Sequence, residues 1–183
     1  MKIDEITNKK SFTKEHNPND EFYTPNYAIR PLEKYIKPNS KILCPFDTEE
    51  SNFVKIFSDN KHSVAYSHIE NHVDFFDLTN LDNFDYIISN PPYSKKFEVF
   101  EKLFATKTKF AMLVGVVGLF ESQKRFNLFK ENDFEVMYLN KRIAYFRDYA
   151  EPKPSLNPPF SSVYICRGIL PKQIVFEEIY KNK

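Results

Sequence analysis

The residues best placed to do chemistry are Asn90, Pro91, Pro92 and Tyr93, which directly follow the run Asp85-Tyr-Ile-Ile-Ser89. The β-branched and aromatic residues of that run favour a strand. The two prolines end the strand because they remove backbone donors and fix φ. Asn90 is therefore expected at the carboxyl edge of a sheet, which is where open α/β sheets bind ligands.

This tetrapeptide suits a planar NH₂ group. The lone pair of such a nitrogen is delocalised, and two acceptors on its hydrogens restore electron density to the nitrogen. The side-chain carbonyl of Asn90 is one acceptor, and we expect the main-chain carbonyl of Pro91, held in direction by Pro92, to be the second. The Tyr93 ring can stack on a base, which contributes roughly 1–3 kcal/mol. The alternative is a strand that simply ends in a proline turn.

Asn-Pro-Pro-Tyr resembles the signature of amino-methyltransferases that use S-adenosylmethionine, and a second segment supports this resemblance. Asp20-Glu-Phe-Tyr-Thr-Pro25 is similar to the N-terminal segment that closes over the cofactor in adenine-N6 DNA methyltransferases of phage and restriction systems. The resemblance implies that Asn90, Pro91, Pro92 and Tyr93 are catalytic. It also implies that Tyr23, Thr24 and Pro25 bind the cofactor.

The loop after the first expected strand, Lys41 to Cys44, matches this family only in part. Pro45 and Phe46 match, but Cys44 replaces the usual acid, and residues 48–51 replace the usual glycines. The segment from Cys44 to Phe53 nevertheless resembles methyltransferase-like proteins of phages and prophages. Carboxylates in the first turn of a helix favour its dipole but repel the carboxylate of a bound amino acid moiety.

Asp47 or Glu49 would instead accept the ammonium group of the cofactor. An equally weighted alternative is that Asp47 to Ser51 only cap the helix that follows.

Further cofactor residues follow from the resemblance. His68, near the end of an expected strand from His62 to Ile69, takes the position of the acid that binds the ribose hydroxyls. Asp74 and Phe75 match the segment that accepts from the adenine amino group and packs on its ring. His68, Glu70, His72 and Asp74 can also be read as a metal cluster, but without helical context this spacing is a weak signal, and we expect no metal.

Substrate contacts are expected from Lys95 and Phe146. Phe146 is placed either against a flipped base or in the core of a hairpin. The net charge of +1 gives no global attraction to nucleic acid, so any contact with nucleic acid must come from local basic patches. The alternative for each basic residue is that it belongs to the solvated surface. The candidate basic residues are Lys9, Lys10, Lys14, Lys95, Lys96, Lys141, Arg142 and Arg147.

The elements that must position these residues alternate between strands and helices, which predicts a parallel α/β sheet. Apolar helical stripes fall between Thr24 and Ile36 and between Phe97 and Phe104, and Lys109 to Val117 reads as a buried strand. Phe134 to Leu139 is a further strand. The resemblance implies a single-domain, Rossmann-like class I methyltransferase fold, with a mostly parallel seven-stranded sheet.

A C-terminal antiparallel hairpin is expected from Lys141 to Phe146 and Ser161 to Arg167. Between these strands lies a rigid loop with four prolines, and residues 172–180 form a closing element of open type. We expect residues 1–19 to be a flexible arm and residues 20–183 to be one domain, without a separate target-recognition domain. Specificity would then come from a loop, a protein partner or a single-stranded substrate.

A cytoplasmic location is expected for this chain. Cys44 and Cys166 lie in apolar runs without metal-ligand spacing, as in a reducing compartment. The N-terminus does not read as a signal peptide, and the longest uncharged run is too short to span a membrane.

Three functions remain open from the sequence. The leading hypothesis is S-adenosylmethionine-dependent methylation of adenine N6 in DNA by an enzyme of phage type, on a flipped-out base. The second is a catalytically inactive relative that engages a host protein or nucleic acid, which the glycine-free loop favours. The third keeps the chemistry and changes the substrate to RNA adenine or a protein glutamine, whose nitrogens are also planar.

Overall fold

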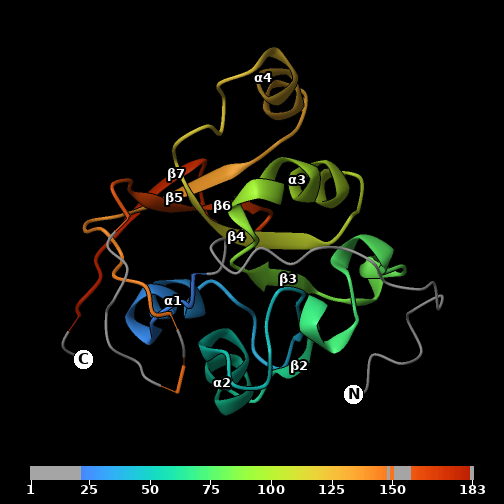
Figure 1. The fold of residues 1–183 in the computed structure, drawn as a ribbon, viewed down its shortest axis with the longest axis vertical. Helices are drawn as coiled ribbons and strands as arrows, with labels where there is room; N and C mark the ends of the chain where they lie inside the picture. The colour runs from blue at the N-terminus through green and yellow to red at the C-terminus, as the bar shows by residue number, and fades with distance from the viewer. Residues whose placement is uncertain (1–21, 148, 151–157, 182–183) are drawn as a thin grey trace.

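A mixed β-sheet runs through the molecule, and its strands position the candidate site residues (Figure 1). The computed structural model describes residues 22–147, 149–150 and 158–181. The sheet has seven strands in the order β2-β1-β3-β4-β6-β5-β7. The strands are β1 (Lys41–Cys44), β2 (Ser63–Tyr66), β3 (Tyr86–Ser89), β4 (Lys109–Gly115), β5 (Glu135–Leu139), β6 (Ser162–Arg167) and β7 (Ile174–Glu177).

Only β6 runs against its neighbours. It is antiparallel to both β4 and β5, whereas all other strand pairs are parallel. The predicted α/β class and the mostly parallel seven-stranded sheet are therefore confirmed. Antiparallel pairing near the C-terminus is also present, but it joins β6 to β5 and β4 and not to the predicted partner, Lys141 to Phe146.

Helices cover both faces of the sheet, as Figure 1 shows. On one face α1 (Asn26–Glu33) and α2 (Asn52–Asp59) bury a core with alternate residues of the strands, and on the other face α3 (Lys96–Phe104) and α4 (Gln123–Lys130) do the same. Four short 3₁₀ turns complete the described chain: η3 (Ile69–Asn71), η4 (Phe75–Asp77), η5 (Leu81–Asn83) and η6 (Tyr93–Lys95). No helix of the described residues has the length and apolar character needed to cross a membrane.

The prediction of a strand from Lys141 to Phe146 is wrong. Within that segment Phe146 makes an isolated antiparallel bridge with Tyr23 instead. The Phe146 amide donates to the Tyr23 carbonyl at 2.9 Å, and the reverse bond measures 3.2 Å. The seventh strand is β7, in the segment whose type the sequence left open. Residues 1–21 and 151–157, which include the predicted arm, three of the candidate lysines and most of the proline loop, lie outside the described residues.

Two predicted boundaries shift because side chains find other partners. The first helix, expected between Thr24 and Ile36, begins at Asn26, and the Thr24 hydroxyl accepts a hydrogen bond from Asn90 at 3.3 Å. The second strand ends at Tyr66, since His68 caps the turn η3 by accepting from the Glu70 amide at 3.3 Å. Pro31 lies inside α1, which continues through it.

Candidate cofactor and substrate site

A cavity of about 180 Å³ opens where β1, β2 and β3 end, at their carboxyl edge. This is the edge at which open α/β sheets bind ligands. Its lining brings together most of the residues that the sequence singled out. These are Tyr23, Thr24, Pro45, Phe46, Asp47, His68, Asp74, Phe75, Asn90, Pro91, Pro92 and Lys95. The described lining does not include Pro25, Tyr93 or Phe146.

Asn90 follows β3 and lies in the cavity with its amide held in one orientation. The Nδ2 group donates to the Phe22 carbonyl at 2.7 Å and to the Thr24 hydroxyl at 3.3 Å. Its Oδ1 is buried, and it has no hydrogen-bond partner among the described residues. A buried acceptor without a partner costs free energy, roughly 1–3 kcal/mol, so this oxygen is suited to accept from a ligand N–H.

The remaining residues of the tetrapeptide divide between cavity and core. Pro91 and Pro92 line the cavity, whereas the Tyr93 ring stacks on Phe22, with centroids 4.7 Å apart and planes at 23°. The Tyr93 hydroxyl donates to the Tyr145 hydroxyl at 3.2 Å. Tyr93 thus belongs to an aromatic cluster beside the cavity, and Phe22 occupies one face of the ring that is predicted to stack on a base.

Asp47 is the acid of the loop after β1 that faces the cavity. Its carboxylate is buried and accepts from the Ser89 hydroxyl at the end of β3, and its amide donates to the Ser67 carbonyl at 2.9 Å. Burial raises the pKa of Asp47 to about 6, although hydrogen bonds from Ser89 and Ser51 lower it. Asp47 therefore ties three strand ends together and is mostly ionised at neutral pH.

The other acids of this loop do not face the cavity. Glu49 and Glu50 are exposed and precede α2, whose first turn contains no acidic residue. Glu50 pairs with Lys55 at 2.6 Å. Ser51 stands at the helix N-cap, but its hydroxyl accepts from the Thr48 amide at 3.0 Å and makes no cap bond to the helix. The expectation of carboxylates in the first turn of the helix is wrong, because the helix begins at Asn52, after Glu49 and Glu50.

Asp74 and Phe75 form a fixed rim on the opposite side. The Asp74 carboxylate accepts from the Phe76 amide at 2.9 Å and so caps η4, and the buried Phe75 ring lies 5.0 Å from that of Phe46. Lys102 of α3 holds this turn from behind. Its ammonium group donates to the carbonyls of Phe75, Phe76 and Leu78 at 2.9, 2.9 and 2.7 Å.

The residues that the sequence did not predict for the site include Tyr149, which lines the cavity, and Lys102, which supports its rim. Lys102 lies beside the apolar stripe of α3, and no local pattern indicates its role. Tyr149 lines the cavity, its ring meets Tyr23 edge-on at 4.8 Å, and burial raises the pKa of its hydroxyl. Its place in a proline-rich loop was a signal, because that loop was expected to border the substrate pocket.

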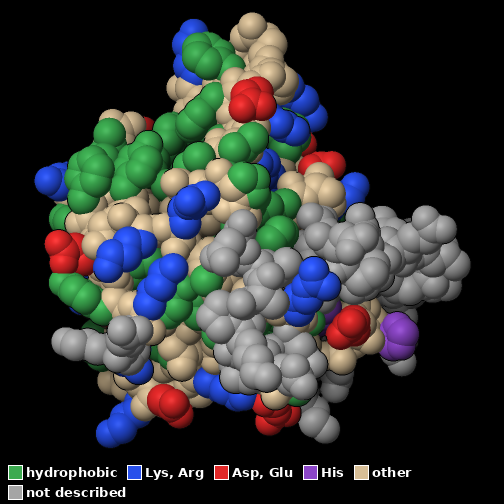
Figure 2. Space-filling view, turned by 60° about the vertical axis from the view of Figure 1, so that its left-hand side comes forward, with side chains coloured by type: hydrophobic (Ala, Val, Ile, Leu, Met, Phe, Trp, Pro, Cys, Tyr) green, Lys and Arg blue, Asp and Glu red, His purple; other side chains and the backbone are tan. Residues whose placement is uncertain are grey.

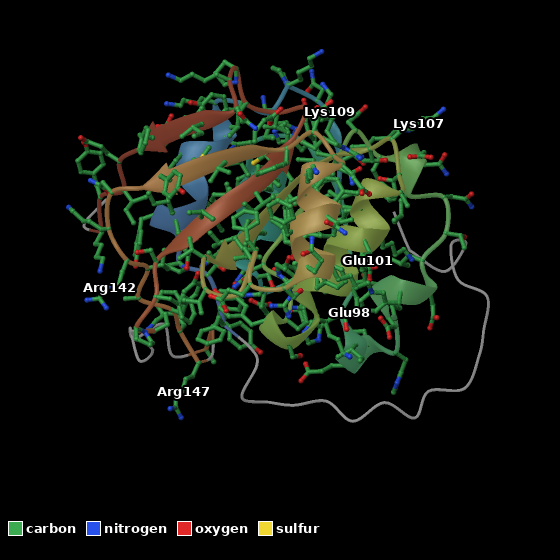
Figure 3. All side chains as sticks on the ribbon, turned by 90° about the horizontal axis from the view of Figure 1, so that it is seen from above. Glu98, Glu101, Lys107, Lys109, Arg142 and Arg147 are labelled. Atoms are coloured by element: carbon green, nitrogen blue, oxygen red, sulfur yellow. The ribbon has the colours of Figure 1, made fainter. Side chains whose placement is uncertain are left out.

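The basic residues do not form one continuous surface on the face drawn in Figure 2, where Lys and Arg side chains are spread among hydrophobic and acidic ones. Lys95 reaches the cavity and lies 3.8 Å from Glu98. In Figure 3, Arg147 lies at the opposite edge of the molecule from Lys107 and Lys109, which flank the amino end of β4. Of these labelled cations, Arg147 is therefore on the cavity side.

Metal ligands are not assembled in the described part of the chain, where no group of three His, Cys, Asp or Glu side chains could hold an ion. His68 and Glu70 do approach each other, at 3.6 Å. Cys44 and Cys166 are buried free thiols, and burial raises the pKa of both.

The lining residues fit S-adenosylmethionine in the type of their polar groups. That molecule carries an amino group on its adenine, two ribose hydroxyls and an ammonium group, all of which donate hydrogen bonds. Asp47, His68 and Asp74 provide acceptors around the cavity, and Phe46 and Phe75 provide apolar surface. The cavity is smaller than the roughly 300–1,000 Å³ typical of small-molecule sites, so such a ligand would extend through its opening.

Structural comparison identifies a solved protein with a similar fold. No family model matches the chain, and no curated protein matches it. A modification subunit assigned to a type I restriction enzyme from Vibrio vulnificus YJ016 is similar over 90% of this chain and 49% of its own, at a TM-score of 0.53 and 12% identity. The predicted Rossmann-like class I methyltransferase fold is thereby confirmed.

Two further solved structures are similar at lower scores. The methyltransferase subunit of a type I restriction-modification system from Streptococcus thermophilus covers 86% of this chain and 47% of its own, at a TM-score of 0.46 and 15% identity. A release-factor-specific protein-(glutamine-N5) methyltransferase from Alicyclobacillus acidocaldarius is similar over 83% of this chain and 93% of its own. The TM-score is 0.37 and the sequence identity 15%. This chain spans about half the length of the two restriction-system subunits.

Proposed function

We propose that this chain is an S-adenosylmethionine-dependent methyltransferase of phage or prophage type that modifies N6 of adenine in DNA. The observation that carries the proposal is the buried Oδ1 of Asn90, which is directed by the hydrogen bonds of its own amide and has no partner among the described residues. An acceptor of this kind favours a ligand that brings a hydrogen-bond donor. The adenine amino group is such a donor.

The chemistry assigned to the protein is positioning and electrostatics. The Asn90 side-chain carbonyl accepts a hydrogen bond from one N–H of the amino group, and the Pro91 main-chain carbonyl is assigned the hydrogen bond from the other N–H. Together they raise the electron density on N6 and aim it into the cavity. When bound, S-adenosylmethionine supplies an electrophilic methyl group. No residue of the chain acts as a covalent nucleophile.

The base is assigned to the space beside Asn90, with Tyr93 as the stacking ring and Phe146 as a further proposed contact. Because Phe22 stacks on Tyr93 in the structure, a base that uses this face of the ring must displace Phe22. The same segment holds the Asn90 amide through the Phe22 carbonyl and the Thr24 hydroxyl. Base entry therefore moves the Phe22 side chain while its backbone stays in place.

Cofactor contacts are assigned to both sides of the cavity. Asp74 accepts from the cofactor's adenine amino group and Phe75 packs on its ring. His68 faces the ribose, and the ionised Asp47 accepts from the ammonium group. Tyr23, Thr24 and Pro25 cover the site from the N-terminal side, and Pro45 and Phe46 border it.

DNA is favoured as the substrate by two observations. The segment Phe22 to Pro25 resembles the one that closes over the cofactor in adenine DNA methyltransferases, and in the structure it lies against Asn90. The similar structure from Vibrio vulnificus is a restriction-enzyme modification subunit. Lys95 at the cavity and Arg147 on the same side of the molecule are the assigned phosphate contacts. Target specificity would come from a loop or a protein partner.

A second candidate function is a catalytically inactive methyltransferase fold that binds a protein or nucleic acid. The loop after β1 favours it, because residues 47–51 contain no glycine to let the backbone approach a cofactor closely. Methylation of RNA adenine or protein glutamine is the remaining enzymatic alternative.

One assay separates these functions. The purified chain is incubated with S-adenosylmethionine and with DNA oligonucleotides, RNA oligonucleotides or glutamine-containing peptides, and methylated nucleosides and residues are measured by mass spectrometry. We expect N6-methyladenine in DNA with the wild type. We expect none with the Asn90→Ala variant, whose circular dichroism spectrum should equal that of the wild type. Equal activity of that variant would refute the mechanism, and methylation of only RNA or peptide would refute the substrate.

A further inference from the structure

Strand β7 ends the sheet with an open hydrogen-bonding edge. In the sheet order it has β5 on one side, and no strand of the described residues on the other (Figure 1). Carbonyls of Gln173 and Glu177 accept from β5 and the residue after it, at 2.7 and 3.0 Å. Since backbone groups of successive strand residues point to alternate sides, those of Ile174 and Phe176 point outward.

The side chains at this edge are apolar and exposed. Phe176 is 76% exposed and Ile174 48%, the Phe176 value being the largest given for a large hydrophobic residue of the described chain. Phe176 stacks on Tyr138 of β5, with ring centroids 5.5 Å apart and planes at 19°. The opposite face of β7 is covered, since Val175 is buried in the core shared with α1. An apolar open edge of this kind is a site for pairing with another strand.

The sequence of this edge is complementary to itself. It reads Lys172-Gln-Ile-Val-Phe-Glu-Glu178. When two copies pair antiparallel about a two-fold axis at Val175, Ile174 of one copy lies opposite Phe176 of the other. In the same register Lys172 lies opposite Glu178, and both are exposed. Cross-strand pairs of these kinds are favourable.

Among the neighbouring registers, the one with its two-fold axis at Val175 satisfies both the backbone hydrogen bonds and the charge pairs. It pairs the outward backbone groups of Ile174 with those of Phe176. Moving the axis to Ile174 places Lys172 opposite Phe176, and moving it to Phe176 places Ile174 opposite Glu178. Each shift loses both charge pairs.

We propose that β7 forms the interface of a homodimer, in which two copies of this chain join their sheets through antiparallel β7 strands. The pairing is isologous, as a two-fold axis requires. The cavity lies at the ends of β1, β2 and β3, in the other half of the sheet. Dimerisation through β7 therefore leaves the cavity of each copy open.

The test is the mass of the full chain in solution, measured by light scattering after size exclusion and by sedimentation velocity over a concentration series. The chain has a mass of 21.7 kDa, and we expect twice that value. Phe176→Lys should shift the protein to monomer. The matched control is Phe126→Lys on α4, where Phe126 is 50% exposed, and it should leave the dimer unchanged.

A charge exchange tests the register. Lys172→Glu and Glu178→Lys each place like charges opposite one another, and each should weaken the dimer at least tenfold. The double variant restores opposite charges in both pairs, and it should recover the wild-type dissociation constant. A monomeric wild type would overturn the proposal and leave the edge to a different partner. A dimer that survives Phe176→Lys and both single exchanges would overturn it as well.

Discussion

The ionisation of Asp47 gives a stability change that can be worked out from its place in the fold. Its carboxyl is buried, and its pKa rises from the ordinary value of 3.8 to about 6 in the folded state, chiefly through burial. Well below pH 3.8 the group is protonated in both states and has no effect. Between pH 4 and pH 6 the unfolded chain ionises first, so stability falls as the pH rises.

Above pH 6 this penalty is complete, and it amounts to about 3 kcal/mol of the free energy of unfolding. Asp47→Asn keeps the shape of the side chain and removes its titration. The free energy of unfolding of the variant minus that of the wild type should therefore increase by about 2–3 kcal/mol between pH 4 and pH 7.5.

Urea unfolding followed by circular dichroism, with both proteins at both pH values, measures this difference. The comparison cancels the titration of every other carboxylate that the two proteins share. A difference that stays the same at both pH values would refute the reasoning. It would mean that Asp47 is solvated and that the ends of β1 and β3 are not joined through it.

Other contacts give further predictions. Lys102→Met removes the donor of three carbonyls in the turn that contains Phe75 and should lower the free energy of unfolding by about 1–3 kcal/mol; urea unfolding with no loss would contradict it. Tyr164→Phe removes a buried bond of 3.0 Å to the Ala28 carbonyl and should cost about 1–2 kcal/mol in the same assay, whereas an unchanged midpoint would mean that the bond is not formed. Cys44 and Cys166 are fully buried with raised pKa values, so Ellman's reagent should react with neither until the protein unfolds, and rapid reaction under native conditions would refute their burial.

The order of helices and strands along the chain could be predicted because apolar residues are spaced differently in helices and in strands. Continuous apolar runs such as Lys109 to Val117 correctly indicated buried strands, and the prolines after Ser89 correctly indicated where β3 ends. The position of a site at the strand ends followed from these boundaries. Most of the candidate residues do line one cavity there.

Several of the errors share one physical cause, because each of these depends on a partner far away in the sequence. The backbone of Phe146 pairs with Tyr23, and the Thr24 hydroxyl accepts from Asn90. Strand propensity of the segment before Phe146 is real, but its neighbour in space is not another sheet strand. Likewise, Tyr93 has the right ring for stacking on a base, and only the fold shows that Phe22 already stacks on it.

The roles of Asp47 and Lys102 were beyond a local pattern for the same reason. Among three neighbouring acids, Asp47 is the one that meets Ser89, and that contact joins loops 42 positions apart in the chain. Lys102 lies on an amphipathic helix, where a lysine normally faces solvent. Its three acceptors come from a turn that precedes Lys102 by 24 to 27 residues.

Calorimetric titration of the purified chain with S-adenosylmethionine, repeated with Asp74→Ala, tests most directly whether the cavity is a cofactor site. The account predicts saturable binding in the micromolar range for the wild type. The variant should bind at least tenfold more weakly, because Asp74 lines the cavity and caps the turn at its rim. Absence of heat and of any thermal shift at millimolar ligand, or equal affinity of the two proteins, would contradict the account.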